Sequence, residues 1–336
     1  MVAGWGCAAV DASIMKHPLR SLAVTYKSSS DAGHVACIGV GLMGSGWAAH
    51  FLRAGRDVVA YDNNPKAADY VKATVERAWP IVEALGLAAD ASTERLRVTD
   101  DLEDALDGAV FVQESAFEDE ALKIGLLSEV DALAADDVVI CSSSSGFLAA
   151  RLRSQCKRAA GRVMVGHPFN PPYLIPLVEV VSGEGANGNA VEAARRFYES
   201  VNSKPIVLNK DIEGYVANRL QLALFREILH LVAEDIASIA DIDDAIAYGP
   251  GLRWAVFGPC QIFKLASQTP EQFGNFLDLI VGEMDDFVAI KEPHIKPGVR
   301  EKVIAGVVEA AGDRDYADLV AERDDKIIAL RKALGV

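Results

Sequence analysis

The stretch that decides the fold is Val35-Ala-Cys-Ile-Gly39-Val-Gly41-Leu-Met-Gly44-Ser-Gly46. An apolar run typical of a buried strand leads into the pattern Gly39-x-Gly41-x-x-Gly44, where a helix is expected to begin. In a dinucleotide-binding turn the first glycine allows a tight bend, the second lets the backbone approach a pyrophosphate, and the third lets helix and strand pack closely. The phosphates then lie at the N-terminus of the helix. The pattern alone is a weak signal, so the residues around it decide its meaning.

A second apolar run, Asp57-Val-Val-Ala-Tyr61-Asp62, ends in an acid 23 residues after Gly39. Asp62 can accept a hydrogen bond from a ribose 2′-hydroxyl, and its charge repels a 2′-phosphate. No arginine follows at once, so the sequence predicts NAD rather than NADP as the cofactor. The cofactor contacts expected from this part of the chain are Gly39, Gly41, Leu42, Met43, Gly44 and Asp62.

A histidine with a carboxylate partner is the second chemical signal. His167-Pro-Phe-Asn-Pro171 is followed, twelve residues after the histidine, by Glu179 in the run Leu177-Val-Glu-Val-Val181. The prolines between them are expected to turn the chain, so that His167 and Glu179 face each other across a loop. A carboxylate fixes the tautomer of an imidazole and stabilises the imidazolium that forms when the ring takes a proton. Such pairs are often structural, but a dinucleotide-binding start in the same chain favours a catalytic base.

The composition limits the class of protein. A chain of 336 residues, 51% of them hydrophobic, can bury a large core, and we expect two domains. The net charge of −15 argues against nucleic acid or an anionic membrane as a partner. No apolar run is long enough to span a bilayer, and the six histidines show no metal-ligand spacing, so no metal is expected. An odd number of cysteines without a CxxC pair predicts buried thiols in a reducing, cytoplasmic setting. These cysteines are Cys7, Cys37, Cys141, Cys156 and Cys260.

Strand-like apolar runs alternate with helical stretches up to about residue 210. A helix is expected at 65–86 after the second strand. The strands expected to follow it lie near Arg97 and at 109–113, 138–141, 162–166, 175–181 and 205–208. Alternation of this kind predicts a parallel sheet covered by helices on both faces. The expected fold class is therefore α/β, with a Rossmann-type doubly wound, mostly parallel sheet followed by an all-helical C-terminal domain.

The pattern becomes helical after Gly214. Residues 215–240 predict one long helix that is apolar around much of its circumference, which favours burial against another helix or a second subunit. A further helix is expected from about Asp241 to the Gly-Pro-Gly at 249–251. The remainder to Val336 is helical and charged, without repeats.

The expected division has three parts. Residues 1–33 fit neither a secretory signal nor a packed element, end in a linker-like run, and are interpreted as an N-terminal tail or an over-long start. Residues 34–212 are expected to form the NAD-binding domain, and residues 213–336 a helical substrate and dimerisation domain. A homodimer is the expected assembly.

From about Val35 to about Pro259, the chain resembles the 3-hydroxyacyl-CoA dehydrogenase superfamily. Within it, the chain is most similar to the branch that oxidises free 3-hydroxy acids, the L-carnitine dehydrogenases and L-gulonate 3-dehydrogenase (lambda-crystallin). The segments that carry the likeness to this branch are Ala78-Trp-Pro-Ile-Val-Glu-Ala-Leu-Gly86, Val112-Gln-Glu-Ser115, Gly166-His-Pro-Phe-Asn-Pro-Pro-Tyr173 and Gly251-Leu-Arg-Trp-Ala255.

The resemblance implies roles for individual residues. His167 matches the catalytic base of the family and Glu179 its partner. Ser145 matches a serine that touches both the substrate oxygen and the nicotinamide, and Asn218 matches an asparagine at the substrate oxygen. The residues that match positions near the nicotinamide end of NAD are Glu118, Lys123 and Asn170.

Departures from the family pattern bear on the substrate. Where the acyl-CoA enzymes carry serine and lysine, this chain carries Ala78 and Leu85, which cannot hold an anionic CoA nucleotide. Branch members that act on carnitine often carry aspartate where this chain has Asn218, and the loss of that charge argues against a quaternary ammonium substrate. The best fit is a small hydroxy acid with a free carboxylate, bound by Arg253 with Trp254 beside it.

Three functions remain open from the sequence. The first is NAD-dependent oxidation of a free (S)-3-hydroxy acid, L-gulonate- or L-carnitine-like, to the 3-keto acid. The second is the same chemistry on a 3-hydroxyacyl-CoA. The third is a non-catalytic, structural NAD-binding protein, against which the complete polar set of Ser145, His167, Glu179 and Asn218 argues.

Overall fold

Eight strands form one sheet in the order β3-β2-β1-β4-β5-β6-β7-β8 in the computed structural model, which describes residues 24–28, 30–265, 267, 269–287 and 298–335. All neighbouring strands are parallel except β6 and β7, which are antiparallel. The strands are β1 (His34–Ile38), β2 (Val58–Tyr61), β3 (Leu96–Thr99), β4 (Ala109–Glu114), β5 (Val139–Ser142), β6 (Val163–Pro168), β7 (Leu177–Val181) and β8 (Lys204–Val207).

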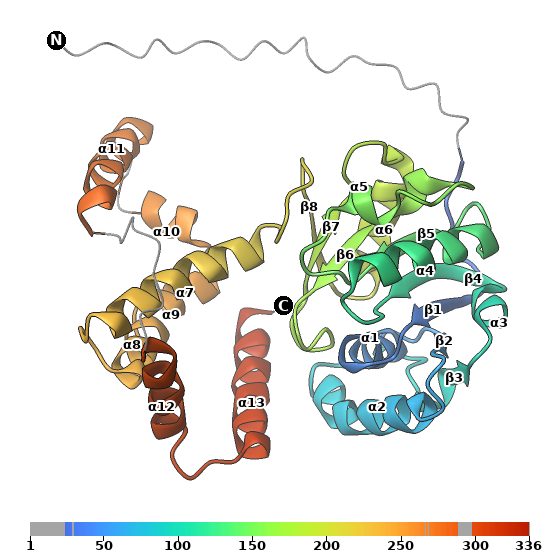
Figure 1. Ribbon diagram of the computed structural model, residues 1–336, viewed down its shortest axis with the longest axis horizontal. Coiled ribbons are helices and arrows are strands. Elements are labelled where there is room, and N and C mark those ends of the chain that lie inside the picture. The colour runs from blue at the N-terminus through green and yellow to red at the C-terminus, as the bar shows by residue number, and fades with distance from the viewer. Residues whose placement is uncertain (1–23, 29, 266, 268, 288–297, 336) are drawn as a thin grey trace.

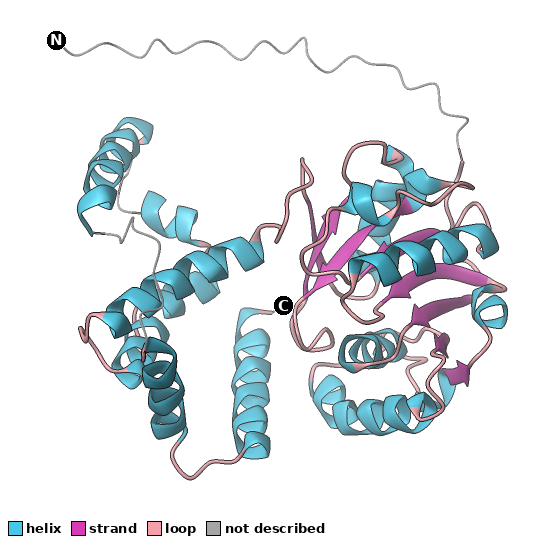
Figure 2. Cartoon of the chain, viewed as in Figure 1, coloured by secondary structure: helices cyan, strands magenta, loops and turns pink. Residues whose placement is uncertain are grey.

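Helices cover both faces of this sheet (Figure 2). The helices of the sheet domain are α1 (Leu42–Arg53), α2 (Ala67–Ala84), α3 (Leu102–Leu106), α4 (Glu120–Leu133), α5 (Ala149–Leu152) and α6 (Gly188–Ser200). Two short 3₁₀ turns, Thr93–Arg95 and Ala160–Arg162, complete the connections. The predicted α/β class with a doubly wound, mostly parallel sheet is confirmed.

The alternation of side chains along β1 explains the two layers. Val35 and Cys37 belong to the core cluster that also contains Trp47 of α1, whereas Ala36 and Ile38 belong to the cluster on the other face. Successive residues of a strand point to opposite faces, so a strand that is apolar throughout must be covered on both sides. The continuous apolar run before Gly39 therefore places β1 in the middle of the sheet.

The second part of the chain is helical (Figure 1). Its described helices are α7 (Ala217–Ala233), α8 (Ile239–Ala247), α9 (Pro250–Val256), α10 (Pro259–Lys264), α11 (Pro270–Phe287), α12 (Val299–Ala311) and α13 (Tyr316–Leu334). The predicted single helix over 215–240 is wrong, because α7 ends at Ala233 and Asp235 takes a left-handed φ of 53°. The Ser238 side chain then caps the N-terminus of α8 by accepting a hydrogen bond from the Asp241 amide.

Helix α7 is covered on one side only. Of its seventeen residues, Val232 alone is buried, and Leu220, Leu222 and Phe225 are 65%, 63% and 45% exposed. The described core of this region consists of Val232, Ile239 and Ile242 with a few partly buried neighbours. Much of the apolar surface that predicted burial of this helix is therefore uncovered within the described residues of one chain.

Helix α13 returns to the sheet domain and packs on α2 (Figure 1). The buried Arg331 guanidinium donates from Nη1 to the backbone carbonyl of Leu174 at 2.9 Å. Leu174 lies in the loop between β6 and β7, so the C-terminal helix holds the loop that separates His167 from Glu179.

The end of the predicted N-terminal tail is attached to the sheet domain. Tyr26 packs against the core, and the Lys27 side chain donates to the Ala109 carbonyl at 3.2 Å. Residues 1–23 lie outside the described residues. In the part of the chain that the structure describes, no helix combines the length and apolar character needed to cross a membrane.

Candidate active site

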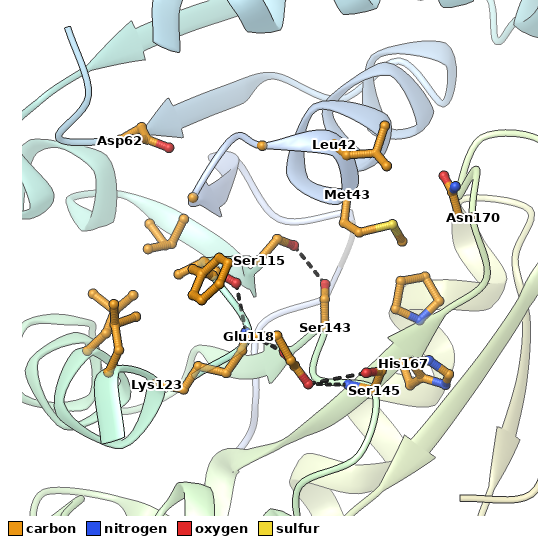
Figure 3. A pocket seen from close by; sticks show the side chains of 18 of the residues that line it. Leu42, Met43, Asp62, Ser115, Glu118, Lys123, Ser143, Ser145, His167 and Asn170 are labelled. Atoms are coloured by element: carbon orange, nitrogen blue, oxygen red, sulfur yellow. Dashed lines mark hydrogen bonds and ion pairs between the residues drawn. The ribbon is translucent and has the colours of Figure 1, made fainter. Parts of the chain in front are cut away.

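A cavity of about 1100 Å³ lies at the carboxyl ends of β1, β2, β4, β5 and β6 (Figure 3). Ligands of open α/β sheets bind at this edge, where the strand order reverses on either side of β1 and β4. Among the predicted site residues, those that line the cavity are Gly39, Gly41, Leu42, Met43, Asp62, Glu118, Lys123, Ser145, His167, Asn170 and Asn218. Gly44, Glu179, Arg253 and Trp254 are not in its lining.

The three glycine positions of the turn differ in why a side chain would not fit or is absent. Gly39 has a φ of +83°, and a Cβ there would lie 2.6 Å from the backbone nitrogen of Ala116. A Cβ on Gly44 would lie 1.9 Å from the Gly39 carbonyl oxygen, so both positions need glycine for the packing of the protein itself. A Cβ on Gly41 would meet nothing within 4 Å. Gly41 therefore leaves space that a pyrophosphate at the start of α1 would fill.

The Asp62 carboxylate is held at the end of β2 by two backbone amides. Oδ2 accepts a hydrogen bond from Val40 at 2.9 Å, and Oδ1 accepts one from Asn64 at 2.9 Å. These bonds connect the acid to the glycine turn and fix its position at the cavity. The geometry suits a carboxylate that receives a ribose hydroxyl.

His167 and Glu179 are directly opposite each other in the antiparallel pairing of β6 and β7. His167 Nδ1 lies 2.8 Å from Glu179 Oε2, and both side chains are buried. Because an ionised carboxylate only accepts, Nδ1 carries the proton in the neutral ring and Nε2 is left as the acceptor. The ring lines the cavity, so this unprotonated nitrogen is available to a substrate hydroxyl.

The second oxygen of Glu179 is bound by the start of α7. Oε1 accepts hydrogen bonds from the backbone amides of Val216 and Ala217 at 2.9 and 3.0 Å. Burial raises the pKa of the Glu179 carboxyl, but the bonds from His167, Ala217 and Val216 outweigh burial and hold the pKa below its usual range. The carboxylate thus stays charged beside the imidazole.

Ser145 and Asn218 are brought together from distant parts of the chain. Asn218 Nδ2 donates to the backbone carbonyl of Ser145 at 3.1 Å. The Ser145 amide and hydroxyl point to Glu118 Oε1 at 2.7 and 3.3 Å (Figure 3). The predicted oxygen-binding pair therefore lies in one cluster at the same cavity as His167.

Lys123 is connected to Ser145 through the Glu118 carboxylate, and it also pairs with Glu114. Its side chain is 1% exposed, and the ammonium nitrogen lies 2.8 Å from Glu114 Oε1 and 3.4 Å from Glu118 Oε2. Glu114 is fully buried, and its other oxygen accepts a hydrogen bond from the Ser142 hydroxyl. The sequence prediction missed Glu114 and Ser142, although a charged residue that ends an apolar strand was an available signal.

The remaining predicted residues lie in two places. Asn170 is exposed in the loop after β6 and lines the cavity. Arg253 and Trp254 are exposed on α9, outside the lining, and their substrate contacts stay a prediction. Within the described residues, no three histidine, cysteine, aspartate or glutamate side chains are grouped as a metal site would require.

The glycine turn, the carboxylate of Asp62 and the cavity at the carboxyl edge of the sheet define an NAD-dependent dehydrogenase of the Rossmann type. The chain belongs to the 3-hydroxyacyl-CoA dehydrogenase family: the NAD binding domain of that family matches residues 34–212, and its C-terminal domain matches residues 214–268. The predicted family, the NAD cofactor and the oxidoreductase class are thereby confirmed.

Curated relatives and a solved structure agree with this assignment. An L-carnitine dehydrogenase from Streptomyces coelicolor is 45% identical over 92% of this chain and 96% of its own length. One from Nocardiopsis dassonvillei is 44% identical over 89% of this chain and 91% of its own length. The crystal structure of 5-formyl-3-hydroxy-2-methylpyridine 4-carboxylic acid 5-dehydrogenase, an NAD⁺-dependent dismutase, superposes with a TM-score of 0.78 at 30% identity. That superposition covers 90% of this chain and 98% of the solved one. Together these relatives support NAD-dependent oxidation of a hydroxy acid.

Proposed function

We propose that this chain oxidises the 3-hydroxyl of a small, free (S)-3-hydroxy acid to the 3-keto acid, with L-carnitine as the first candidate substrate. The observation that carries the proposal is the buried His167–Glu179 pair. His167 lines the same cavity as the glycine turn, and the pairing through Nδ1 leaves its Nε2 as the acceptor. The L-carnitine dehydrogenase relatives support the choice of substrate, and their identity over about nine tenths of the chain outweighs the single departure at Asn218. An L-gulonate-like acid is the second candidate.

His167 is the general base of the proposed reaction. Its Nε2 takes the proton of the 3-hydroxyl, and the charged Glu179 stabilises the imidazolium that results. Ser145 and Asn218 hold the oxygen as it becomes a carbonyl. NAD, when bound, supplies the hydride acceptor. The residues that hold the cofactor are the glycine turn, Asp62 and Asn170 directly, and Lys123 through Glu118.

A 3-hydroxyacyl-CoA is the alternative substrate, and the helix after Asp62 disfavours it. Ala78 is 1% exposed and packs in the core of the sheet domain, and Leu85 follows the end of α2. Neither position offers a charge to a CoA nucleotide. A purely structural role is disfavoured by the complete catalytic set and by the enzymatic relatives.

We propose two further properties that depend on the C-terminal helices. The exposed apolar side chains Leu220, Leu222 and Phe225 of α7 would be covered in a two-fold homodimer. Arg253 and Trp254 would bind the substrate carboxylate once α9 is brought to the cavity. The division into a tail (1–33), an NAD-binding domain (34–212) and a helical domain (213–336) is part of this proposal.

One assay separates the candidate substrates. NADH formation is followed by absorbance with L-carnitine, L-gulonate, 3-hydroxybutyrate and 3-hydroxybutyryl-CoA at matched concentrations. The proposal expects a free acid to have the highest kcat/KM. A higher kcat/KM for the CoA thioester would replace it with the acyl-CoA function, and the absence of turnover with every compound would count against the proposed reaction.

A further inference from the structure

Two serine hydroxyls at the centre of the cavity belong to a polar chain that begins in the core of the sheet domain. Ser143 and Ser115 both line the cavity, and their hydroxyl oxygens are 2.7 Å apart (Figure 3). Behind them, Gln113 is fully buried at the end of β4. Neither the resemblance nor the proposed reaction assigns a role to these residues.

The orientation of the Gln113 amide is fixed by its neighbours. Tyr198 Oη lies 2.6 Å from Gln113 Oε1, and the Gly166 carbonyl, which can only accept, lies 3.4 Å from Nε2. Burial raises the pKa of Tyr198 well above its usual range, so the phenol keeps its proton and donates it. The amide NH₂ group of Gln113 therefore faces Ser143 as a donor.

The hydrogen-bond partners of Ser143 leave a single acceptor for its hydroxyl proton. Its Oγ accepts from Gln113 Nε2 at 2.8 Å and from the indole Nε1 of Trp47 at 3.2 Å. A hydroxyl oxygen has two lone pairs and one proton, and these two donors occupy both lone pairs. Ser143 must consequently donate to Ser115.

Ser115 is left with its own proton. Its hydroxyl accepts from Ser143 and has no other hydrogen-bond partner among the described residues. Since Ser115 lines the cavity, the donor is turned toward whatever occupies it. The chain Tyr198–Gln113–Ser143 thus fixes the direction of one hydrogen bond to a ligand.

The strand order identifies the part of the ligand that Ser115 meets. Asp62 follows β2, Gly41 follows β1, Ser115 follows β4, and His167 lies on β6 beyond β5. A dinucleotide with its adenosine ribose at Asp62 and its reacting ring at His167 must cross β4 with its nicotinamide nucleotide half. A Cβ on Gly44 would lie 3.3 Å from the Ser115 Cβ, which places Ser115 beside the first turn of α1.

We infer that Ser115 is a cofactor-binding residue whose hydroxyl donates to an acceptor oxygen on the nicotinamide nucleotide half of NAD, with Ser143 as the residue that directs it. The inference rests on the NAD site proposed above. A hydrogen bond of this kind contributes about a tenfold difference in affinity.

The test compares binding of two probes by the purified protein. In Ser115→Ala, the dissociation constant of NADH, measured by fluorescence, should rise about tenfold. The dissociation constant of AMP, measured by competition and reporting the adenosine half alone, should stay at the wild-type value. Ser128→Ala is the matched control, because Ser128 lies on α4 outside the lining of this cavity and its hydroxyl donates to the Gln155 carbonyl.

The binding results test the role of Ser115 separately from the proposed NAD site. Equal NADH affinity in Ser115→Ala and wild type overturns the inference while leaving the NAD site intact. Parallel weakening of NADH and AMP, or a lowered melting temperature, overturns it as well, because the substitution then acts on the whole site. Failure of the wild-type protein to bind NADH would instead overturn the proposed site itself.

Discussion

His167 and Glu179 face each other across the only antiparallel pairing among the described strands of the sheet, with Nδ1 and Oε2 2.8 Å apart. The backbone register of β6 and β7 sets their distance, so the side chains need no further adjustment to meet. Glu179 also accepts hydrogen bonds from two backbone amides at the start of α7. The proposed catalytic pair therefore lies where the sheet domain and the helical region join.

The first prediction concerns this pair. His167→Ala should lower kcat by about 10²–10⁴-fold with nearly unchanged affinity for NADH, because the base is lost and the cofactor contacts are not. Glu179→Gln keeps the shape and removes the charge that stabilises the imidazolium, so kcat should fall as well. Steady-state kinetics of the double variant should show a loss smaller than the product of the two single losses. Losses that multiply in full would show that the residues act separately.

The second prediction concerns the cofactor. Asp62 lies at the cavity with a fixed carboxylate, so the wild-type enzyme should prefer NAD to NADP by about 100-fold in kcat/KM. Asp62→Ser removes the charge that repels a 2′-phosphate and should narrow this ratio. Asp57→Ser, at an exposed acid paired with Arg95, is the control and should keep it. Equal use of both cofactors by the wild type would contradict the role of Asp62.

The third prediction concerns the buried ion pair of Lys123 and Glu114. Lys123→Met should leave the fully buried Glu114 without its cation and lower the free energy of unfolding by about 3–5 kcal/mol. Lys326→Met removes the exposed partner of Glu322 on α13 and should lower the free energy of unfolding much less, because exposed ion pairs contribute little. Urea denaturation measures the free energy of unfolding of both variants. Restoration of stability by adding Glu114→Gln to Lys123→Met would identify the unpaired charge as the cause.

The fourth prediction concerns acid stability. Burial lowers the pKa of His50 to about 3, and the positive charges of Arg53 and Arg331 act in the same direction. Below about pH 6.5 the unfolded chain binds a proton at this histidine that the folded chain does not, so this residue makes stability fall as the pH drops toward 3. The loss from His50 should reach about 2 kcal/mol at pH 5. Urea unfolding of His50→Gln at pH 5 and 7.5 should show a correspondingly smaller difference, and an unchanged difference would refute this origin.

The fifth prediction concerns assembly. Light scattering should report a dimer at micromolar concentration, because α7 exposes more apolar surface than a monomer normally leaves uncovered. Leu222→Glu on α7 should yield monomers, whereas Leu87→Glu, at an exposed leucine of the sheet domain, should not. A monomeric wild-type protein would contradict the proposed interface.

Local backbone requirements made much of the site predictable from sequence. The glycine turn and the acid after β2 follow from short-range rules, and β1, α1 and β2 lie where those rules placed them. The spacing of His167 and Glu179 worked for a similar reason, since a short connection leaves few arrangements other than adjacent antiparallel strands. The break after Ala233 was missed because the apolar periodicity continues through it.

Contacts between distant strands could not be predicted in this way. Gln113 meets Ser143 because β4 and β5 are parallel neighbours with Gln113 opposite Cys141, and nothing in either segment specifies that register. Lys123 was predicted as a cofactor contact, which stays a prediction, and its burial beside Glu114 depends on how α4 packs against the sheet. Such partners are set by tertiary packing, which a single sequence does not display.

The return of α13 to the sheet domain limits how the helical region can move. The chain leaves the sheet domain after β8 and comes back where α13 packs on α2, with Arg331 bound to Leu174. A body attached at two points can turn about the line that joins them, but it cannot swing freely in other directions. Asn218 lies close to the first point, so such a rotation would displace it least and leave the bond from Asn218 to Ser145 almost in place.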